Sequence, residues 1–302
     1  MGRPRHGVRK SIFEVKMPEL PEVQTIANQL ERELAGKEIV GLVVHNAKSF
    51  VGKRSDVISQ KIINITRRAK VLTIKLSNKK WLLIHLKMTG QLIYVNEEIR
   101  IAGGHPDHDW HANLPNNHTR LTFEFADGSE LFFNDIRKFG WCKVMGEEEM
   151  STYFEKYGPE PLPKINLEYL KEKAVKMNKS AIKRFLMDQG VIAGIGNIYA
   201  DEILFASQVH PERTAGSITD TEWQKIALNT EDILSFAIEM GGTTDSDYVN
   251  AYGVRGGMQD HLKVYHRTGE PCLKKCGGAV ERIIVGGRST HFCPNCQKES
   301  VK

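Results

Sequence analysis

The sequence predicts a multidomain α+β protein: an N-terminal antiparallel β sandwich with a flanking helix, then a helical domain and a short C-terminal ribbon. Three observations predict this class. Runs rich in β-branched and aromatic residues fill the first half of the chain. Helical periodicity replaces them after the proline-rich segment 158–163. Two close pairs of cysteines stand near the C-terminus.

The composition is that of a globular protein large enough for more than one hydrophobic core, with 302 residues, 40% hydrophobic and 26% charged. No run of about 18 apolar residues occurs, so neither a membrane span nor a membrane partner is expected. Residues 1–16 lack the apolar stretch of a secretory signal. They carry most of the net charge of +5, so only local clusters of charge can indicate a partner.

The first predicted helix follows the stretch Met-Pro-Glu-Leu-Pro-Glu-Val at 17–23. Pro21 suits a first helical position, so we expect the helix to run from Glu22 to Leu34. An apolar stripe repeats along it, and Gly36 ends it. Such a helix would hold the residues before it at a fixed place on a core.

Those preceding residues are chemically unusual. If translation starts at Met17 and that residue is removed, Pro18 has a free secondary amine, and Glu19 stands beside it as a proton donor. With residues 1–16 in place, the nitrogen of Pro18 is an unreactive amide. We therefore expect Met17 to be the true start, and 1–16 to be an extension that is not in the active protein.

The β sandwich is expected within residues 17–146. Asp127-Gly128 is a strong hairpin signal between two alternating runs. The segment 96–118 is expected to be a solvated surface loop. A metal site formed by its four histidines is the less favoured alternative, because their spacings fit no regular element: His105, His108, His111 and His118. The predicted strand runs are 38–45, 62–76, 81–95, 119–125, 130–134 and 141–145.

A linker at 147–163 leads to the predicted helical domain, 164–261. Within it, the glycine-rich turn before Asn197 enters a helix, where backbone N–H groups can bind a phosphate. No strand precedes the turn, which argues against a dinucleotide-binding fold and favours a phosphate-gripping helix–turn–helix variant. Residues 243–260 are expected to form a mobile loop. The predicted helices are 167–177, 180–189, 197–207 and 221–240.

The four C-terminal cysteines predict one structural zinc site in residues 262–302. Two close pairs far apart in sequence suit a two-stranded ribbon in which four thiolates close a tetrahedral site: Cys272, Cys276, Cys293 and Cys296. The strands are expected at 281–285 and 289–292. The ribbon holds eight Lys or Arg residues against three acids, which favours contact with phosphate over the alternative of a solvated basic surface.

Two strand ends carry side chains that could point into a groove. Arg137 and Phe139 lie two residues apart in Asp-Ile-Arg-Lys-Phe-Gly, and Met88 forms a similar tip in His-Leu-Lys-Met-Thr-Gly. Taken alone, each pattern also fits core packing.

Together these motifs resemble the bacterial formamidopyrimidine-DNA glycosylase family, which removes oxidised purines from DNA. The resemblance runs from Met17 to about Gln297. It is carried by the start at 17–23, Arg-Arg-Ala-Lys (67–70), His-Leu-Lys-Met-Thr-Gly (85–90), Arg-Lys-Phe-Gly (137–140), Gly-Pro-Glu-Pro-Leu (158–162), Gly-Ile-Gly-Asn-Ile-Tyr-Ala (194–200) and the four-cysteine ribbon.

The resemblance implies a helix–two-turn–helix in the helical domain and DNA in a cleft between the domains. It makes Pro18 the nucleophile at the sugar C1′ and Glu19 the acid and base. Lys70 would serve the first elimination and Arg288 the second. The partner would be double-stranded damaged DNA, and the protein would act as a monomer in the bacterial cytoplasm.

The same resemblance implies a set of DNA contacts. Residues that would replace the everted nucleotide in the stack are Met88, Arg137 and Phe139. Residues that would contact the backbone or flanking DNA are His85, His118, Asn197 and Lys179. Lys179 is the substitute for a family lysine, since Asn178 stands where the family has it. The first cysteine pair is also spaced by three residues where the family usually has two.

Three other functions remain open on the sequence. An endonuclease-VIII-type relative that acts on oxidised pyrimidines shares the fold and the Pro-Glu start. A non-catalytic DNA- or lesion-binding protein would result if Pro18 stays blocked. A generic zinc-ribbon nucleic-acid binder would leave the Pro-Glu start and the Arg-Lys-Phe-Gly motif unexplained.

Overall fold

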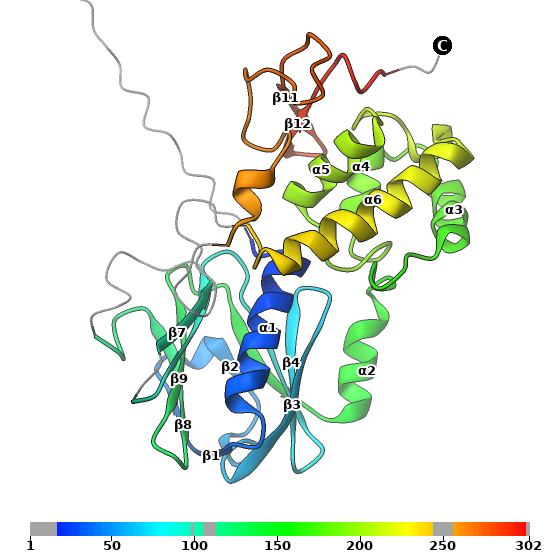
Figure 1. Cartoon of the computed structure of the whole chain (residues 1–302). Coiled ribbons are helices and arrows are strands. Elements are labelled where there is room, and N and C mark those ends of the chain that lie inside the picture. The colour runs from blue at the N-terminus through cyan, green and yellow to red at the C-terminus, as the bar shows by residue number, and fades with distance from the viewer. Residues whose placement is uncertain (1–16, 98–99, 105–112, 244–255, 300–302) are drawn as a thin grey trace, which may run out of the picture.

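The computed structural model describes residues 17–97, 100–104, 113–243 and 256–299. The chain forms two bodies, a β domain and a helical domain that carries the ribbon (Figure 1). Helix α1 (Leu20–Leu34) packs on the β domain, and its N-terminal end points at helix α6 (Asp220–Glu239) of the other body. The first described residues, Met17 to Leu20, therefore lie where the two bodies meet.

Helix α1 begins two residues earlier than expected, with Glu19 as its N-cap. The carboxylate of Glu22 accepts a hydrogen bond of 2.9 Å from the backbone N–H of Glu19, which satisfies a donor that the helix leaves free. Leu30 and Leu34 sit in the core of the β domain, whereas Leu20 is buried in the core of the helical domain. One helix thus joins both cores.

The β domain is a folded sheet. Its described strands are hydrogen-bonded in the order β2-β10-β5-β4-β3-β1-β8-β9-β6-β7. Strands β1 and β3 share only the pairs Glu38 with Lys61 and Ile39 with Gln60, and the sheet divides there into two halves whose apolar side chains share one core. The strands are β1 (Glu38–Val44), β2 (Phe50–Val51), β3 (Gln60–Arg68), β4 (Val71–Leu76), β5 (Trp81–His85), β6 (Gly90–Val95), β7 (Arg100–Gly104), β8 (Thr119–Phe125), β9 (Glu130–Asp135) and β10 (Trp141–Met145).

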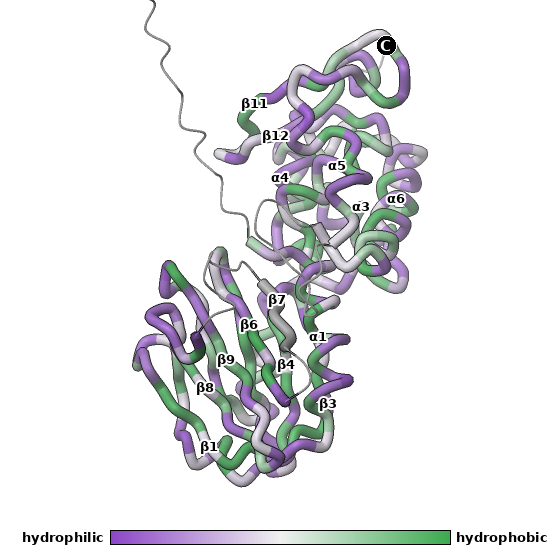
Figure 2. Tube along the Cα trace, turned by 60° about the vertical axis from the view of Figure 1, so that its left-hand side comes forward, coloured by the Kyte–Doolittle hydropathy of each residue, from purple (hydrophilic) through white to green (hydrophobic). Residues whose placement is uncertain are grey.

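The sandwich prediction is confirmed, with several corrections. The runs 62–76 and 81–95 each contain two strands, and the turns between them hold Ala69 and Lys87 at positive φ. Strand β7 lies in the segment expected to be a loop, and β2 pairs with β10 in parallel, so the domain is not wholly antiparallel. His105, His108 and His111 lie outside the described residues. Figure 2 shows hydrophobic stretches along β6 and β9, as expected for strands packed in a core.

The segment expected to be a linker, 147–163, begins with helix α2 (Glu147–Glu155). Three glutamates in its first turn face the positive end of the helix dipole, and this stabilises a helix that has no fully buried residue. The other helices lie close to their predicted bounds: α3 (Leu167–Lys176), α4 (Ile182–Met187), α5 (Asn197–Ser207) and α6. Among the described helices, none has the length and apolar character needed to cross a membrane.

Most of the segment expected to be a mobile loop, 243–260, lies outside the described residues, which resume at Gly256. A short 3-10 helix, Met258–His261, follows and leads into the ribbon. Met258 is buried in the core of the helical domain, so this end of the segment is anchored.

The ribbon consists of β11 (Glu281–Val285) and β12 (Arg288–Phe292), paired antiparallel as expected. Gly286 and Gly287, both at positive φ, form the turn between them. Strand β12 packs against α5 of the helical domain. This contact places Arg288, at the tip of the ribbon, beside the junction of the two bodies.

Candidate active site

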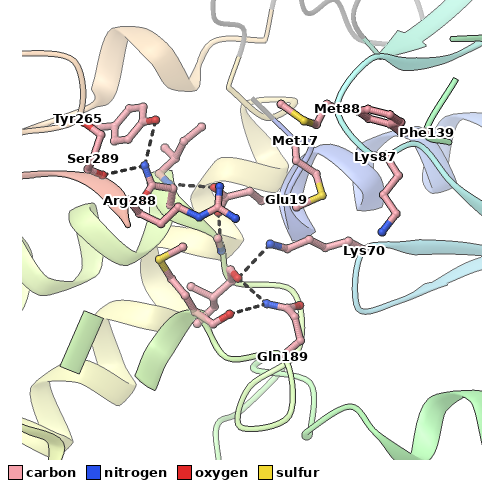
Figure 3. Close-up of a pocket in the computed structure, with 15 residues that line it drawn as sticks. Met17, Glu19, Lys70, Lys87, Met88, Phe139, Gln189, Tyr265, Arg288 and Ser289 are labelled. Atoms are coloured by element: carbon pink, nitrogen blue, oxygen red, sulfur yellow. Dashed lines mark hydrogen bonds between the residues drawn. The ribbon is translucent and has the colours of Figure 1, made fainter. Parts of the chain in front are cut away.

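A cavity of about 650 Å³ lies at that junction (Figure 3). The β domain, the helical domain and the ribbon all contribute to its wall. The polar residues that line it are Glu19, Lys70, Lys87, Gln189, Asn197, Tyr265, Arg288 and Ser289. The structure therefore brings Glu19, Lys70 and Arg288, which are far apart in the sequence, to one site.

Glu19 is held by the glycine-rich turn before α5. The backbone N–H groups of Gly196 and Ile198 donate to its two carboxylate oxygens at 2.7 and 2.8 Å. Glycine at position 196 allows this close approach, because a Cβ there would lie 2.3 Å from the carboxyl carbon of Glu19 and would displace the carboxylate. The turn expected to bind a phosphate thus uses two of its N–H groups on a carboxylate of the chain itself.

This enclosure changes the acidity of Glu19, which is only 3% exposed. Burial raises its pKa to about 7, while nearby Lys70 acts in the opposite direction. Lys70 donates to the carbonyl oxygen of Ile195 at 3.0 Å, and burial lowers its pKa against the attraction of Glu19. Glu19 is therefore able to exchange a proton near neutral pH, and the neutral form of Lys70 is favoured relative to that of an exposed lysine.

Glu22 supports this arrangement from the next turn of α1. Its carboxylate accepts from Glu19, from the hydroxyl of Tyr199 at 2.6 Å and from the backbone of Thr243 at 2.8 Å. Burial raises its pKa. Because Thr243 follows α6, Glu22 ties the C-terminal end of that helix to the N-terminal end of α1.

Pro18 is buried next to Glu19, and Met17 lies on the cavity wall (Figure 3). Here the Pro18 nitrogen is in peptide linkage. A protonated free amine at this position would lower the pKa of Glu19 further, as Lys70 does.

Arg137, Phe139 and Met88 form a group of exposed or partly exposed side chains at one edge of the cavity. The Arg137 guanidinium lies 4.8 Å from the centroid of the Phe139 ring, and its Nη1 lies 3.2 Å from Met88 Sδ. Phe139 remains 53% exposed, so core packing is ruled out for it. The fully buried Asp135 fixes the loop by accepting from the backbone N–H groups of Arg137 and Gly140.

His85, at the end of β5, is almost fully buried. Its Nδ1 accepts from the backbone N–H of Lys87 at 3.0 Å, which leaves the proton of the neutral ring on Nε2. Burial, followed by the charges of Lys87, Lys70 and Lys156, lowers its pKa to about 3. His85 is thus a neutral hydrogen-bond donor at physiological pH.

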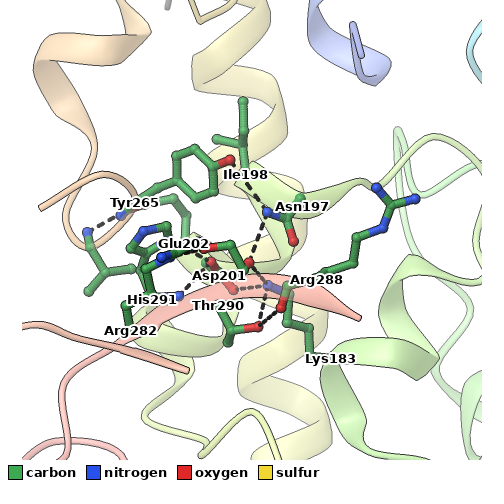
Figure 4. Close-up of polar contacts among 12 residues, drawn as sticks. Lys183, Asn197, Ile198, Asp201, Glu202, Tyr265, Arg282, Arg288, Thr290 and His291 are labelled. Carbon is green, nitrogen blue, oxygen red and sulfur yellow. Dashed lines mark hydrogen bonds and ion pairs between the residues drawn. The ribbon is translucent and has the colours of Figure 1, made fainter. Parts of the chain in front are cut away.

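Arg288 is positioned by a buried polar cluster (Figure 4). Lys183 Nζ lies 2.7 Å from Asp201 and donates to Ser289 O and Thr290 Oγ1, both at 2.8 Å. Asp201 also accepts from the backbone N–H of His291 at 2.8 Å. These contacts lock β12 to α4 and α5, while the Arg288 side chain extends to the cavity (Figures 3 and 4).

Asn197 belongs to the same cluster. Its Nδ2 donates to Ser289 O at 2.9 Å and approaches the hydroxyl of Tyr265 at 3.4 Å. A phosphate contact from this side chain would have to replace those bonds. The positive end of α5, where Asn197 is the first residue, offers a second way to hold a phosphate.

The four cysteines converge as predicted. Their Sγ atoms lie within 4.8 Å of one another, with 3.7 Å between Cys272 and Cys296 and 3.5 Å between Cys276 and Cys293. Ligands about 2.3 Å from a tetrahedral zinc are about 3.8 Å apart, so the set fits one structural zinc. The three-residue spacing in the first pair does not disturb this fit.

Four of the predicted contact residues do not line the cavity: His85, Arg137, His118 and Lys179. His118 precedes β8, and its carbonyl oxygen accepts from Asp135 N at 2.9 Å, beside the Arg137 loop. Lys179 is exposed between α3 and α4. The sequence did not indicate Lys87, Gln189 or Tyr265, because each acts here through tertiary contacts that no local pattern reports.

Comparison with known proteins assigns the chain to a family. The family model for the formamidopyrimidine-DNA glycosylase N-terminal domain matches residues 17–142, and that for the H2TH domain matches 157–249. The model described as the zinc finger found in FPG and IleRS matches 269–298. The chain belongs to the formamidopyrimidine-DNA glycosylase family.

Curated members of the formamidopyrimidine-DNA glycosylase family are similar over nearly their whole length. The protein of that name from Listeria innocua is 41% identical over 93% of this chain and 100% of its own length, and that from Streptococcus mutans is 40% identical over 94% and 100%. The Lactococcus lactis enzyme, solved with DNA containing an abasic site, is 32% identical with a TM-score of 0.81 over 93% of this chain and 99% of its own. A mutant of the Lactococcus lactis enzyme, solved with DNA containing Fapy-dG, has a TM-score of 0.82 with 32% identity over 93% and 100%.

Proposed function

We propose that this chain is a bifunctional DNA glycosylase and abasic-site lyase of base excision repair. Its substrate would be double-stranded DNA with oxidised purines, 8-oxoguanine and formamidopyrimidines. The observation that carries the proposal is the cavity in which Glu19, directly after Pro18, meets Lys70 and Arg288. The names and bound lesions of the relatives support the substrate class.

In the proposed first step, the lone pair of the free Pro18 nitrogen attacks C1′ of the damaged nucleotide. The bond from C1′ to the base breaks, and its electrons leave with the base. Glu19, with its pKa near neutrality, donates a proton to the departing base or to the sugar ring oxygen. Loss of the proton from the Pro18 nitrogen accompanies opening of the sugar, and an iminium remains between enzyme and DNA.

The proposed second stage cleaves the strand. Lys70, whose pKa is lowered by burial, serves the removal of a proton from C2′, and the 3′ phosphate leaves. Arg288 assists loss of the phosphate on the other side. The zinc would supply no chemistry here and would close the ribbon that holds Arg288.

A base inside a duplex cannot reach this cavity, so the damaged nucleotide has to be everted. Met88 and Phe139, which line the cavity, and Arg137, which contacts both, are proposed to fill the gap that it leaves. His85 through Nε2, Asn197, His118 and Lys179 are proposed to contact the DNA around it. We also propose that the protein acts as a monomer in the bacterial cytoplasm, in keeping with its bacterial relatives.

The proposed chemistry requires a free amine at Pro18, so the active form would begin there. The test is borohydride trapping on 8-oxoguanine duplex with two proteins, the chain beginning at Pro18 and the chain that retains residues 1–16. We expect a covalent protein–DNA adduct with the first and none with the second. Adducts with neither protein would refute the imine mechanism and favour a binding protein without catalysis.

The same assay with a thymine-glycol duplex separates the substrate classes. Faster excision of thymine glycol than of 8-oxoguanine would transfer the proposal to oxidised pyrimidines. The N-terminal residue of protein expressed from the natural gene, determined by mass spectrometry, shows whether the cell makes the reactive form.

A further inference from the structure

Three lysines form a cluster on the β domain next to the cavity. Lys87 lies in the turn after β5, Lys143 in β10, and Lys156 directly after α2. Burial and the charges of Lys156 and Lys143 all lower the pKa of Lys87, which places the three ammonium groups within electrostatic reach of one another. We call these three residues the lysine cluster.

Aromatic rings connect the lysine cluster and hold its stems. Lys143 Nζ lies 4.7 Å from the centroid of the Trp141 ring, and Lys156 Nζ lies 4.2 Å from that of Tyr153. The Trp141 and Tyr153 rings contact each other at 5.8 Å. The two ammonium groups therefore lie over two rings that pack edge to face, and these contacts restrict their side chains before any partner binds.

The lysine cluster has no acidic partner within the described part of the chain. Other lysines do: Lys37 pairs with Asp127, Lys80 with Asp56 and Lys171 with Asp220. None of the three cluster lysines makes an ion pair among the described residues. Like charges that are held together without counter-charges raise the energy of the free protein, and a bound anion removes that cost.

The lysine cluster continues the wall of the cavity. Lys87 lines the cavity, and its backbone N–H fixes His85 with Nε2 as a donor. The centroid of the Trp141 ring lies 5.6 Å from that of His85, and the same Trp141 ring contacts Lys143. A polyanion that contacts Lys87 at the cavity would also come near Lys143 and Lys156, whose charges act on Lys87.

We propose that Lys87, Lys143 and Lys156 form a track for the sugar–phosphate backbone of DNA that flanks the lesion on one side. This inference builds on the proposed function, since it extends the same DNA-binding face beyond the cavity. Ammonium groups on flexible stems contact phosphates as point charges, so the track would bind all sequences alike.

The test compares Lys143→Gln/Lys156→Gln with Lys225→Gln in binding to undamaged duplex DNA as salt is varied. Lys225 is an exposed lysine of α6 and provides a matched loss of charge away from the cavity. Each lost phosphate contact lowers the slope of log affinity against log salt by about 0.9. We expect a decrease of about 1.8 for the double variant, a uniform loss of affinity across sequences, and little change for Lys225→Gln.

Shortening the duplex locates the track. If the lysines follow one flank, removing the base pairs of that flank abolishes the difference between the wild type and the double variant, and removing the other flank preserves it. Lys143→Arg/Lys156→Arg retains both charges and should bind as the wild type does. Thermal unfolding of each variant identifies any loss of folding.

An unchanged salt slope in a folded double variant would overturn the proposal and leave the lysine cluster as a solvated surface. Equal losses in the double variant and Lys225→Gln would also overturn it. Neither result touches the proposed function, which is judged separately by whether the wild-type chain beginning at Pro18 forms the trapped adduct. Absence of the adduct together with the expected slopes would leave a DNA-binding track on a protein without the proposed catalysis.

Discussion

Among the residues that the structure describes, Lys183 and Lys70 are both buried near carboxylates, and their surroundings differ. Lys183 and Asp201 are both 0% exposed and 2.7 Å apart. Lys183 also donates to two oxygen atoms of β12, and Asp201 Oδ2 accepts from the backbone of His291, so both side chains are fixed within the protein. Lys70 donates to Ile195 O and faces the cavity together with Glu19.

The difference separates structural from reactive charge. A buried ion pair is tolerated when its geometry is good and its remaining hydrogen bonds are made. Removing only one of the two charged side chains is costly, because the other charge is left buried without a partner. Glu19 is fixed by two backbone donors, but Lys70 and Glu19 form no ion pair among the described contacts. Their charges act on each other through space, which shifts their pKa values while leaving them available to a substrate.

Glu19→Gln in the chain beginning at Pro18 is the strongest test that Glu19 has a catalytic and not a structural role. Glutamine keeps the size of the side chain but cannot supply the proton. Base excision should fall by about 10²- to 10⁴-fold, the usual worth of general acid–base catalysis. Single-turnover excision of 8-oxoguanine measures this, with duplex binding and thermal unfolding as controls. Excision within about tenfold of the wild type would remove the proton role.

Lys183→Met tests whether the Lys183–Asp201 ion pair stabilises the fold. It leaves the Asp201 carboxylate buried without its cation, and we expect a loss of about 3–5 kcal/mol in the free energy of unfolding. Lys183→Met/Asp201→Asn removes both charges and should recover much of that loss, because no ion is then left unpaired. Denaturant unfolding of the zinc-loaded protein measures both. A single variant within about 1 kcal/mol of the wild type would show that this pair is not structural.

The sequence predicted more of the fold than of these contacts. Periodicity placed α5 at its observed bounds, and cysteine spacing predicted the ribbon, because both signals are local. It missed α2, whose stability comes from acids at its N-terminus and not from an apolar stripe. It also merged β3 with β4, since the turn at Ala69 contains no glycine or proline to mark it.

The sequence predicted which residues form the candidate site, but it did not predict the contacts that hold them. The motifs named Glu19, Lys70 and Arg288, but the sequence could not show that a glycine turn 177 residues away binds the Glu19 carboxylate. That turn was expected to bind a phosphate, because a helix N-terminus accepts any anion and its partner is decided by tertiary packing. Lys87 and Gln189 carried no signal for the same reason.

Lys70→Met should affect catalysis far more than folding, the reverse of Lys183→Met, and its expected effect is smaller than that of Glu19→Gln. Burial disfavours the charge of both lysines, but Lys70 makes no ion pair among the described residues, so Lys70→Met should lower the free energy of unfolding much less than Lys183→Met does. Strand cleavage after base loss should slow by about 10²-fold, at the lower end for acid–base catalysis. A preformed abasic-site duplex isolates this step. Strand cleavage at the wild-type rate would exclude Lys70 from the elimination.

The pH dependence of base excision gives the smallest effect and probes the coupling between Glu19 and Lys70 directly. The reactive form needs Glu19 protonated and the Pro18 amine neutral. The pKa of Glu19 is about 7 with Pro18 in peptide linkage and lower beside a protonated free amine, and an α-amine has an ordinary pKa near 8. These requirements give a bell-shaped profile whose optimum lies midway between the two pKa values and which falls about fivefold from pH 8 to 9. In Lys70→Met the cation that lowers the pKa of Glu19 is absent, so the optimum should move to higher pH.

Profiles normalised to their own maxima separate this shift from any change in the rate itself, and Lys225→Gln should leave the optimum in place. The direction of the shift is diagnostic, because a merely structural loss at Lys70 would lower the excision rate at every pH without moving the bell. An optimum at the same pH in the wild type and in Lys70→Met would mean that the two charges do not interact across the cavity.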